Sequence, residues 1–409
     1  MSTVTAGVDL ARLRPLNERL QRDFVDAGRI PGCQWLLARR GQVVARHALG
    51  RMDAERDRPF SDETLVRIYS MTKPITSVAL MMLYEEGRFG LNDPVHEWIP
   101  SWREQRVWVQ GRGAQMQTRP PRQPVTMRQL LNHSSGLTYG GVLLPAGTEP
   151  DPVDEAYRAA DINTRNGDSL QTLVDKLGRV PLRYEPGEAW AYSFATDVCG
   201  HLVECISGLP FQRFLQQRVF EPLGMRDTCF TVPADQAHRL AACYRHEGEQ
   251  RRRVLADDPA TSPWRQVPAL HSGGGGLVSS LSDYHRFAEM LRRGGELDGV
   301  RILGPRTLQL MRVNHLPGDA DLTQRAIDSF SETLHQGVGF GLGFATTLSG
   351  ARAGVPGAGD FYWGGLASTI FWVDPVEDLV AIFLTQLIPS RTYNFRGLFK
   401  SVVYGALVD

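Results

Sequence analysis

The sequence predicts an α+β fold, in which helices flank one antiparallel sheet and a mainly helical segment is inserted. Two observations predict it. Each end of the chain carries one helical pattern and one pair of strand patterns, whereas the Pro- and Gly-punctuated middle carries short helical patterns. One sheet covered by the two terminal helices is the simplest way to bury both ends. We therefore expect a discontinuous sheet domain of residues 1–90 and 271–409, and an inserted domain of residues 91–270.

The N-terminal end predicts a helix followed by a hairpin. Apolar side chains recur at helical spacing, at Leu13, Leu16, Leu20 and Phe24. The pattern stops at Gly28, a residue that often ends a helix. Two runs of β-forming residues follow at 33–38 and 42–48, and turn-forming residues separate them.

The C-terminal end repeats these elements in reverse order. Apolar runs at residues 367–373 and 379–384 are joined by a turn-forming stretch, which predicts a second hairpin. The last segment has one apolar stripe at helical spacing, made of Phe395, Leu398, Phe399, Val402, Val403 and Ala406. In the middle of the chain, residues 170–177 and 198–206 predict helices, and long loops are expected around them.

Composition narrows the function classes. The 409 residues are 42% apolar and 22% charged, which is typical of a globular protein with a substantial core. The 45 basic and 45 acidic residues cancel, so we expect neither nucleic acid nor a membrane as partner. The N-terminus has no apolar stretch of signal-peptide length, which favours a cytoplasmic location. Five cysteines without a C-x-x-C pair indicate buried free thiols and no metal site.

The segment around Ser70 and Lys73 is the most informative one for chemistry. Lys73 is followed by Pro74, an apolar helical face and a stop at Gly87. Proline is tolerated in a first turn, so a helix begins beside Ser70 and directs positions 70 and 73 to the same side. One feature opposes this arrangement, because a residue that precedes proline disfavours helical geometry.

A serine followed three residues later by lysine suits nucleophilic catalysis. A serine hydroxyl needs a base, and lysine serves as one when its pKa falls from about 10.4 by roughly 2 to 3 units. Arginine cannot do so because it stays protonated. Of the 45 basic residues only Lys73, Lys176 and Lys400 are lysine, so a lysine at this position is informative. The alternative is a surface lysine after an N-capping serine.

With these residues the chain resembles the serine β-lactamase and penicillin-binding-protein superfamily, whose S-x-x-K motif carries the nucleophile. A second motif is matched by the Tyr-Ser-Phe tripeptide at 192–194, and a third by Trp-Gly-Gly at 363–365. Further similar phrases lie at 130–137 and 274–280, so the resemblance spans roughly residues 30–390. It implies a β-lactamase/transpeptidase-like fold, with the active site in the cleft between the two expected domains.

Two departures from the superfamily motifs indicate the branch. Phe194 stands where the superfamily has asparagine, and Trp363 with Gly364 stands in place of Lys-Thr. In β-lactamases and peptidases those polar groups contact the lactam and its carboxylate. The chain is more similar to family VIII carboxylesterases, which have Tyr-Ser plus an apolar residue and a Trp-Gly-Gly strand.

The resemblance also implies roles for individual residues. Ser70 would be acylated, Lys73 would accept its proton, and Tyr192 would relay a proton to the leaving group, although Lys73 and Tyr192 could exchange roles. Backbone amides of Ser70 and Leu366 would form the oxyanion hole. The substrate pocket would comprise Trp363, Gly364, Gly365 and Phe194. Outside this set, His133 is interpreted as a structural residue, and the Gly-Asp-Ser-Leu phrase at 167–170 as a chance match.

We therefore expect a serine carboxylesterase that hydrolyses short-chain esters through an acyl-enzyme, with a small ester as substrate and no cofactor or metal. Three alternatives stay open. They are an acyltransferase that passes the acyl group to an alcohol, a β-lactamase or D-Ala peptidase-type hydrolase, and a catalytically silent binding protein. The sequence does not indicate the oligomeric state.

Overall fold

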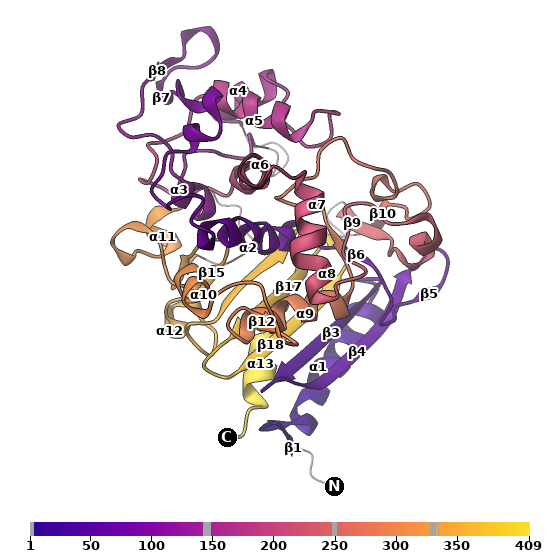
Figure 1. Ribbon diagram of the computed structural model, residues 1–409. Coiled ribbons are helices and arrows are strands. Elements are labelled where there is room, and N and C mark those ends of the chain that lie inside the picture. Colours follow the sequence, from indigo (N-terminus) through magenta and orange to yellow (C-terminus); the bar gives the residue numbers. More distant parts are fainter. Residues whose placement is uncertain (1–3, 142–148, 248–251, 328–332, 334) are drawn as a thin grey trace.

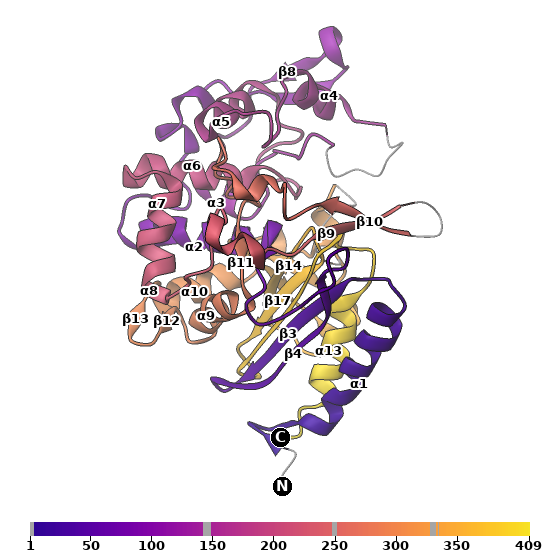
Figure 2. The same ribbon diagram turned by 90° about the vertical axis from the view of Figure 1, so that its right-hand side faces the viewer.

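The centre of the protein is an eight-stranded antiparallel sheet (Figures 1 and 2). The computed structural model describes residues 4–141, 149–247, 252–327, 333 and 335–409. From one edge to the other, the strands are β14 (Val338–Phe340), β15 (Ala345–Thr347), β16 (Phe361–Gly365), β17 (Thr369–Asp374), β18 (Leu379–Thr385), β3 (Gly32–Arg39), β4 (Gln42–Asp53) and β5 (Arg58–Pro59). This arrangement confirms the predicted antiparallel sheet.

Both predicted hairpins lie in the middle of this sheet. β3 and β4 are joined by Arg40 and Gly41, whose φ angles of 53° and 75° suit a tight turn. β17 and β18 form the second hairpin, and β18 pairs with β3 over its whole length. The two ends of the chain therefore meet at the β18–β3 pair, and every residue of both strands is buried.

Helices cover both faces of the sheet. On one face α1 (Arg14–Arg19), continued by a helical segment over Leu20–Asp26, lies beside α13 (Phe395–Gly405), as Figure 2 shows. The ring of Phe399 packs 5.8 Å from that of Trp35 on β3. On the other face α9 (Leu281–Arg292) places Tyr284 5.0 Å from Phe371 of β17. The predicted terminal helices are thus confirmed, with their apolar stripes against the sheet.

A second group of helices precedes α9 in the chain. It consists of α3 (Met127–Leu131), α4 (Pro152–Ala159), α5 (Leu170–Arg179), α6 (Ala195–Ser207), α7 (Phe211–Leu215) and α8 (Glu221–Leu223). The long helix α2 (Thr72–Glu85) packs against α6 and so joins this group to the sheet. The helices predicted at residues 170–177 and 198–206 are α5 and α6.

The middle segment also contains strands that its sequence pattern does not predict. β7 (Val107–Gln110) pairs with β8 (Gln117–Arg119), and β9 (Cys243–Glu247) pairs with β10 (Arg252–Asp257). β9 also pairs in parallel with β19 (Leu387–Ile388), far along the chain. Because this pairing connects the middle segment to the C-terminal segment, the domain boundary near residue 270 stays a prediction.

The remaining elements are short. They are β1 (Val4–Thr5), β2 (Val8–Asp9), β6 (Val66–Arg67), β11 (Val278–Ser279), β12 (Glu296–Leu297), β13 (Val300–Arg301), α10 (Pro305–Arg312), α11 (Leu322–Arg325) and α12 (Gly350–Ala353). The β6–β11 pair directly precedes the turn that carries Ser70.

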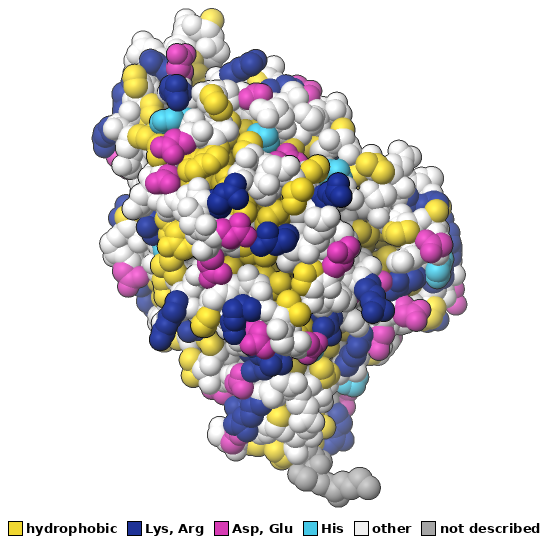
Figure 3. Space-filling view, viewed as in Figure 1, with side chains coloured by type: hydrophobic (Ala, Val, Ile, Leu, Met, Phe, Trp, Pro, Cys, Tyr) yellow, Lys and Arg dark blue, Asp and Glu magenta, His cyan; other side chains and the backbone are white. Residues whose placement is uncertain are grey.

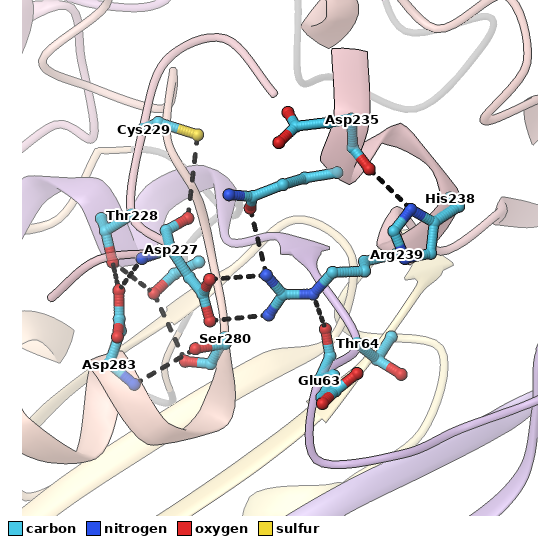
Figure 4. A network of polar contacts seen from close by, with 12 residues as sticks. Glu63, Thr64, Asp227, Thr228, Cys229, Asp235, His238, Arg239, Ser280 and Asp283 are labelled. Carbon is cyan, nitrogen blue, oxygen red and sulfur yellow. Dashed lines mark hydrogen bonds and ion pairs between the residues drawn. The ribbon is translucent and has the colours of Figure 1, made fainter. Parts of the chain in front are cut away.

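A polar network fixes the chain on either side of the β6–β11 pair (Figure 4). Arg239 forms two hydrogen bonds of 2.7 Å with Asp227, and its Nε donates to the carbonyl oxygen of Glu63. Asp283, in the first turn of α9, accepts hydrogen bonds from the amide of Asp227 and the hydroxyl of Thr228. Burial, reinforced by the carboxylate of Asp227, raises the pKa of Asp283 to about 6.

On the face shown in Figure 3, Lys and Arg side chains are interspersed with Asp and Glu. Within the described residues, no helix combines the length and apolar character that a membrane span requires.

The expectation of buried thiols holds for Cys33, Cys199 and Cys243 but is wrong for Cys205, which is exposed near the end of α6. Cys205 lies on the outward-facing side of α6, and a count of cysteines does not indicate which side of a helix each of them occupies.

Candidate active site

Ser70 lies in a strained turn directly before α2. The turn, Tyr69–Met71, begins with Tyr69 at a φ angle of 43°, a left-handed conformation that residues with a side chain seldom adopt. The end of β16 approaches the same turn, since an added Cβ at Gly365 would overlap the carbonyl oxygen of Ile68. Gly365 is therefore needed for the packing of β16 against this turn, and its place in the substrate pocket stays a prediction.

Lys73 lies in the first turn of α2, as the spacing predicts, although Pro74 follows it. Its Nζ is 3.3 Å from Ser70 Oγ, 2.8 Å from the hydroxyl oxygen of Tyr139 and 2.6 Å from the carbonyl oxygen of Gly274. The side chains are nearly enclosed, because Ser70 is 9% exposed and Lys73 2%. The structure thus brings Ser70 and Lys73 within contact distance.

The partners of Lys73 are compatible with a base. The carbonyl oxygen of Gly274 can only accept, so it takes one N–H of the amine. If a second N–H points to Tyr139, a neutral amine has its lone pair left for the proton of Ser70. After proton transfer, the three N–H groups of the ammonium can point to the same three oxygens, those of Gly274, Tyr139 and Ser70. Lys73 therefore need not move between the two protonation states.

Tyr192 lies beside Lys73, on the loop that leads into α6. The centre of its ring is 4.5 Å from Lys73 Nζ, and its hydroxyl oxygen accepts a hydrogen bond of 3.2 Å from Trp363 Nε1. The hydroxyl oxygen of Tyr192 is thus held by a donor from β16, and its ring lies against the amine of Lys73. All three residues predicted to handle protons or the acyl group therefore lie in one cluster.

His133 is a buried neighbour of this cluster. One ring nitrogen is 3.0 Å from the hydroxyl of Ser193, and the other is 3.5 Å from that of Thr196. Burial, reinforced by the charge of Lys73, lowers the pKa of His133 well below its usual range. A neutral, hydrogen-bonded His133 agrees with the structural interpretation.

The expected pocket residues Trp363, Gly364, Gly365 and Phe194 are all buried. Trp363 is fully buried, and Phe194 packs its ring 4.7 Å from that of Tyr139. Leu366 is only partly buried and belongs to an apolar cluster that includes Tyr69 and Trp264, next to Ser70. Among these residues, Leu366 and Trp264 are partly exposed, whereas Trp363 contacts Tyr192 through its indole nitrogen.

Two residues beside the Ser70–Lys73 cluster are not predicted from the sequence. Tyr139 follows the phrase at 130–137 by two residues, but nothing in its spacing indicates a contact with Lys73. Asp197 is buried on α6 and accepts a hydrogen bond of 3.1 Å from the amide of Gly274. The only available signal was the run of glycines around Gly274, which indicates a close approach of the backbone without naming its partner.

Other candidate features lie elsewhere. Ser169 of the Gly-Asp-Ser-Leu phrase is the N-cap of α5, where its hydroxyl accepts from the amide of Thr172. A cavity of about 470 Å³ lies among residues 122–134, 185–188 and 315–317, and Ser70 is not part of its lining. In the described part of the chain, no three His, Cys, Asp or Glu side chains gather as a metal site would require.

Curated relatives share most of their length with this chain. An uncharacterized protein from Mycobacterium tuberculosis is 33% identical over 382 residues, 92% of this chain and 91% of the relative. The esterase EstB from Burkholderia gladioli is 32% identical over 376 residues, 88% of this chain and 86% of EstB. The acyltransferase calJ from Penicillium decumbens is 24% identical over 351 residues, 81% of this chain and 78% of calJ.

Among solved structures, EstCE1, a hydrolase with promiscuous acyltransferase activity, superposes with a TM-score of 0.80 at 27% identity. The match covers 97% of this chain and 99% of EstCE1. The profile of the Beta-lactamase family matches residues 17–397. The chain therefore belongs to the Beta-lactamase family and is a serine hydrolase with esterases and acyltransferases among its relatives.

Proposed function

We propose that this protein is a carboxylesterase that hydrolyses small, short-chain esters through an acyl-enzyme on Ser70. The observation that carries the proposal is the 3.3 Å separation of Lys73 Nζ and Ser70 Oγ in a nearly enclosed site. A lysine in this position can take the hydroxyl proton as the oxygen attacks. The esterase activity named for EstB and the hydrolase activity named for EstCE1 support the same reaction class.

In the first step Ser70 Oγ forms a bond to the carbonyl carbon of the ester, and its proton passes to Lys73 or to a Tyr192 phenolate. The tetrahedral oxyanion would accept hydrogen bonds from the amides of Ser70 and Leu366. The bond to the alcohol oxygen then breaks, and the alcohol leaves with a proton relayed through Tyr192. Water repeats the sequence on the acyl-enzyme, releases the acid and restores Ser70.

The test compares Ser70→Ala with Ser77→Ala on a panel of p-nitrophenyl esters from acetate to octanoate. Ser77 is a matched control because it is also a buried serine and lies within α2, the helix that follows Ser70. We expect loss of hydrolysis in Ser70→Ala alone, fastest turnover of the shorter esters, and an intact mass one acyl group heavier during turnover. Hydrolysis at the wild-type rate by Ser70→Ala would exclude the mechanism.

Acyl transfer is a second candidate, which the enclosure of Ser70 and Lys73 favours. An acyl-enzyme shielded from water survives longer and can meet an alcohol acceptor. The named activities of calJ and EstCE1 point the same way. Product analysis with increasing butanol separates the two candidates, since formation of a butyl ester shows transfer, and free acid at every concentration excludes it.

The β-lactamase alternative makes the opposite substrate prediction. The apolar Phe194 and Trp363 occupy the positions where β-lactamases present polar groups to the lactam. We therefore expect slow turnover of a chromogenic cephalosporin beside fast ester hydrolysis. The reverse order of rates would favour the lactam-cleaving function.

A further inference from the structure

The glycine-rich loop that follows His271 is held by helices on two sides. From α2, the hydroxyl of Thr76 donates a hydrogen bond of 2.8 Å to the carbonyl oxygen of Gly273. From α6, one carboxylate oxygen of Asp197 accepts hydrogen bonds from the hydroxyl of Ser272, at 2.5 Å, and from the amide of Gly274, at 3.1 Å. The loop thus has a defined position between α2 and α6.

Glycine is required at two positions of this loop. An added Cβ at Gly274 would lie 2.5 Å from the second carboxylate oxygen of Asp197. An added Cβ at Gly273 would lie 2.6 Å from the carbonyl oxygen of Thr196. Both distances are too short for real contacts, so the glycine run lets the backbone lie directly against the N-terminal turn of α6.

The loop connects Asp197 to Lys73 through a single residue. The amide of Gly274 donates to Asp197, and its carbonyl oxygen accepts from Lys73 Nζ at 2.6 Å. Asp197 is 1% exposed, so little water screens its attraction to the lysine. Burial raises the pKa of Asp197, and the charge of Lys73 together with the hydrogen bond from Ser272 opposes that shift.

We propose that Asp197 is a positioning residue for the ester hydrolysis. Its carboxylate fixes Gly274 against Lys73 and supplies the negative charge that stabilises the ammonium group formed when Ser70 releases its proton. The inference rests on the proposed function, because it assigns Lys73 the proton of Ser70. It assigns no contact with substrate to Asp197.

Other titratable groups face this pair from the elements packed around it. Cys199 lies on α6, and burial raises the pKa of its thiol. His133 faces Lys73 and is neutral because its pKa is lowered by burial. The hydroxyl of Tyr139 and the ring of Tyr192 complete the surroundings of the lysine. Asp197 is the carboxylate among these groups, so its charge is the one that the variants below test.

The decisive variant is Asp197→Asn, which keeps the size and an acceptor oxygen for Ser272 and Gly274 but removes the charge. We expect the acid limb of the kcat/KM profile to move to lower pH by about one unit, because a buried opposite charge shifts a pKa by roughly that much or more. We also expect kcat at the plateau to fall about tenfold, since a less basic lysine accepts a proton less readily, with KM unchanged.

Asp283→Asn is the matched control, because it neutralises another buried aspartate that lies in the network of Figure 4. It should leave the acid limb in place. An unshifted acid limb in Asp197→Asn overturns the inference, even if the melting temperature falls, because a merely structural role would change stability alone.

Should Asp197→Asn not fold, Ser272→Ala provides the second test. It removes the 2.5 Å contact that orders the loop and keeps both charged groups. We expect a severalfold lower kcat with unchanged KM, and wild-type kcat would overturn the inference. All rates are measured on hydrolysis that Ser70→Ala abolishes, so activity that persists in Ser70→Ala refutes the proposed function and not the role of Asp197.

Discussion

The indole nitrogen of Trp363 donates a hydrogen bond of 3.2 Å to the hydroxyl oxygen of Tyr192. The two rings lie 5.3 Å apart, and Trp363 is fully buried on β16. The tryptophan of the Trp-Gly-Gly strand therefore contacts the candidate site through Tyr192, whose hydroxyl oxygen it holds. The place of Trp363 in the substrate pocket stays a prediction.

Trp363→Phe removes this donor and keeps an aromatic ring in the core. We expect kcat for p-nitrophenyl butyrate to fall severalfold, because a net hydrogen bond contributes about 0.5–1.5 kcal/mol. KM should change little. Trp35→Phe is the control, since it removes an equally buried indole donor, to Asn17, far from the site. Equal losses of kcat in both variants would contradict the assignment.

Tyr139→Phe tests the partner of Lys73 that sequence reasoning missed. The hydroxyl oxygen of Tyr139 is 2.8 Å from Lys73 Nζ, and its loss leaves the lysine less firmly directed at Ser70. We expect roughly a fivefold lower kcat, consistent with one net hydrogen bond of about 1 kcal/mol. Tyr404→Phe, which removes a hydrogen bond to Asp374, should lower the melting temperature without lowering kcat. Full activity of Tyr139→Phe would show that the contact is dispensable.

Gly365→Ala tests the close approach of β16 to the turn that carries Ser70. Its Cβ would overlap the backbone of Ile68, so the strand must shift and take the amide of Leu366 with it. Displacement of one oxyanion donor reduces kcat about 100-fold or more. At Gly364 the nearest atoms to an added Cβ are 3.1 Å away, so Gly364→Ala should lose much less. Indistinguishable rates in the two variants would refute this geometry.

Local patterns explain which parts of the fold could be predicted. The hairpins around Gly41 and at residues 375–378 are set by neighbouring residues, as is the (i, i+3) approach of Ser70 and Lys73. The terminal helices likewise follow from their own apolar stripes. Each of these features depends on a few consecutive turns of the chain.

Contacts between distant segments could not be predicted in this way. Tyr139 reaches Lys73 across 66 positions, and Asp197 reaches Gly274 across 77. The pairing of β9 (Cys243–Glu247) with β19 joins residues still further apart along the chain. Such contacts follow from the packing of α2, α6 and the sheet, which no single sequence pattern encodes.

The pH dependence of stability offers a test of the network in Figure 4. The pKa of Asp283 is raised to about 6 by burial and by Asp227, whereas an unfolded aspartate has a pKa of about 3.9. The folded state therefore binds the proton more tightly, so the contribution of Asp283 to stability rises as pH falls from about 7 toward 4.

Asp283→Asn lacks this titration, and the comparison with wild type isolates it from all other groups. We expect the difference in unfolding free energy, wild type minus variant, to increase by about 2 kcal/mol between pH 7.5 and pH 4.5. Urea unfolding of both proteins at several pH values measures it. A constant difference across this range would mean that Asp283 titrates near its unfolded pKa, which its burial against Asp227 and Thr228 argues against.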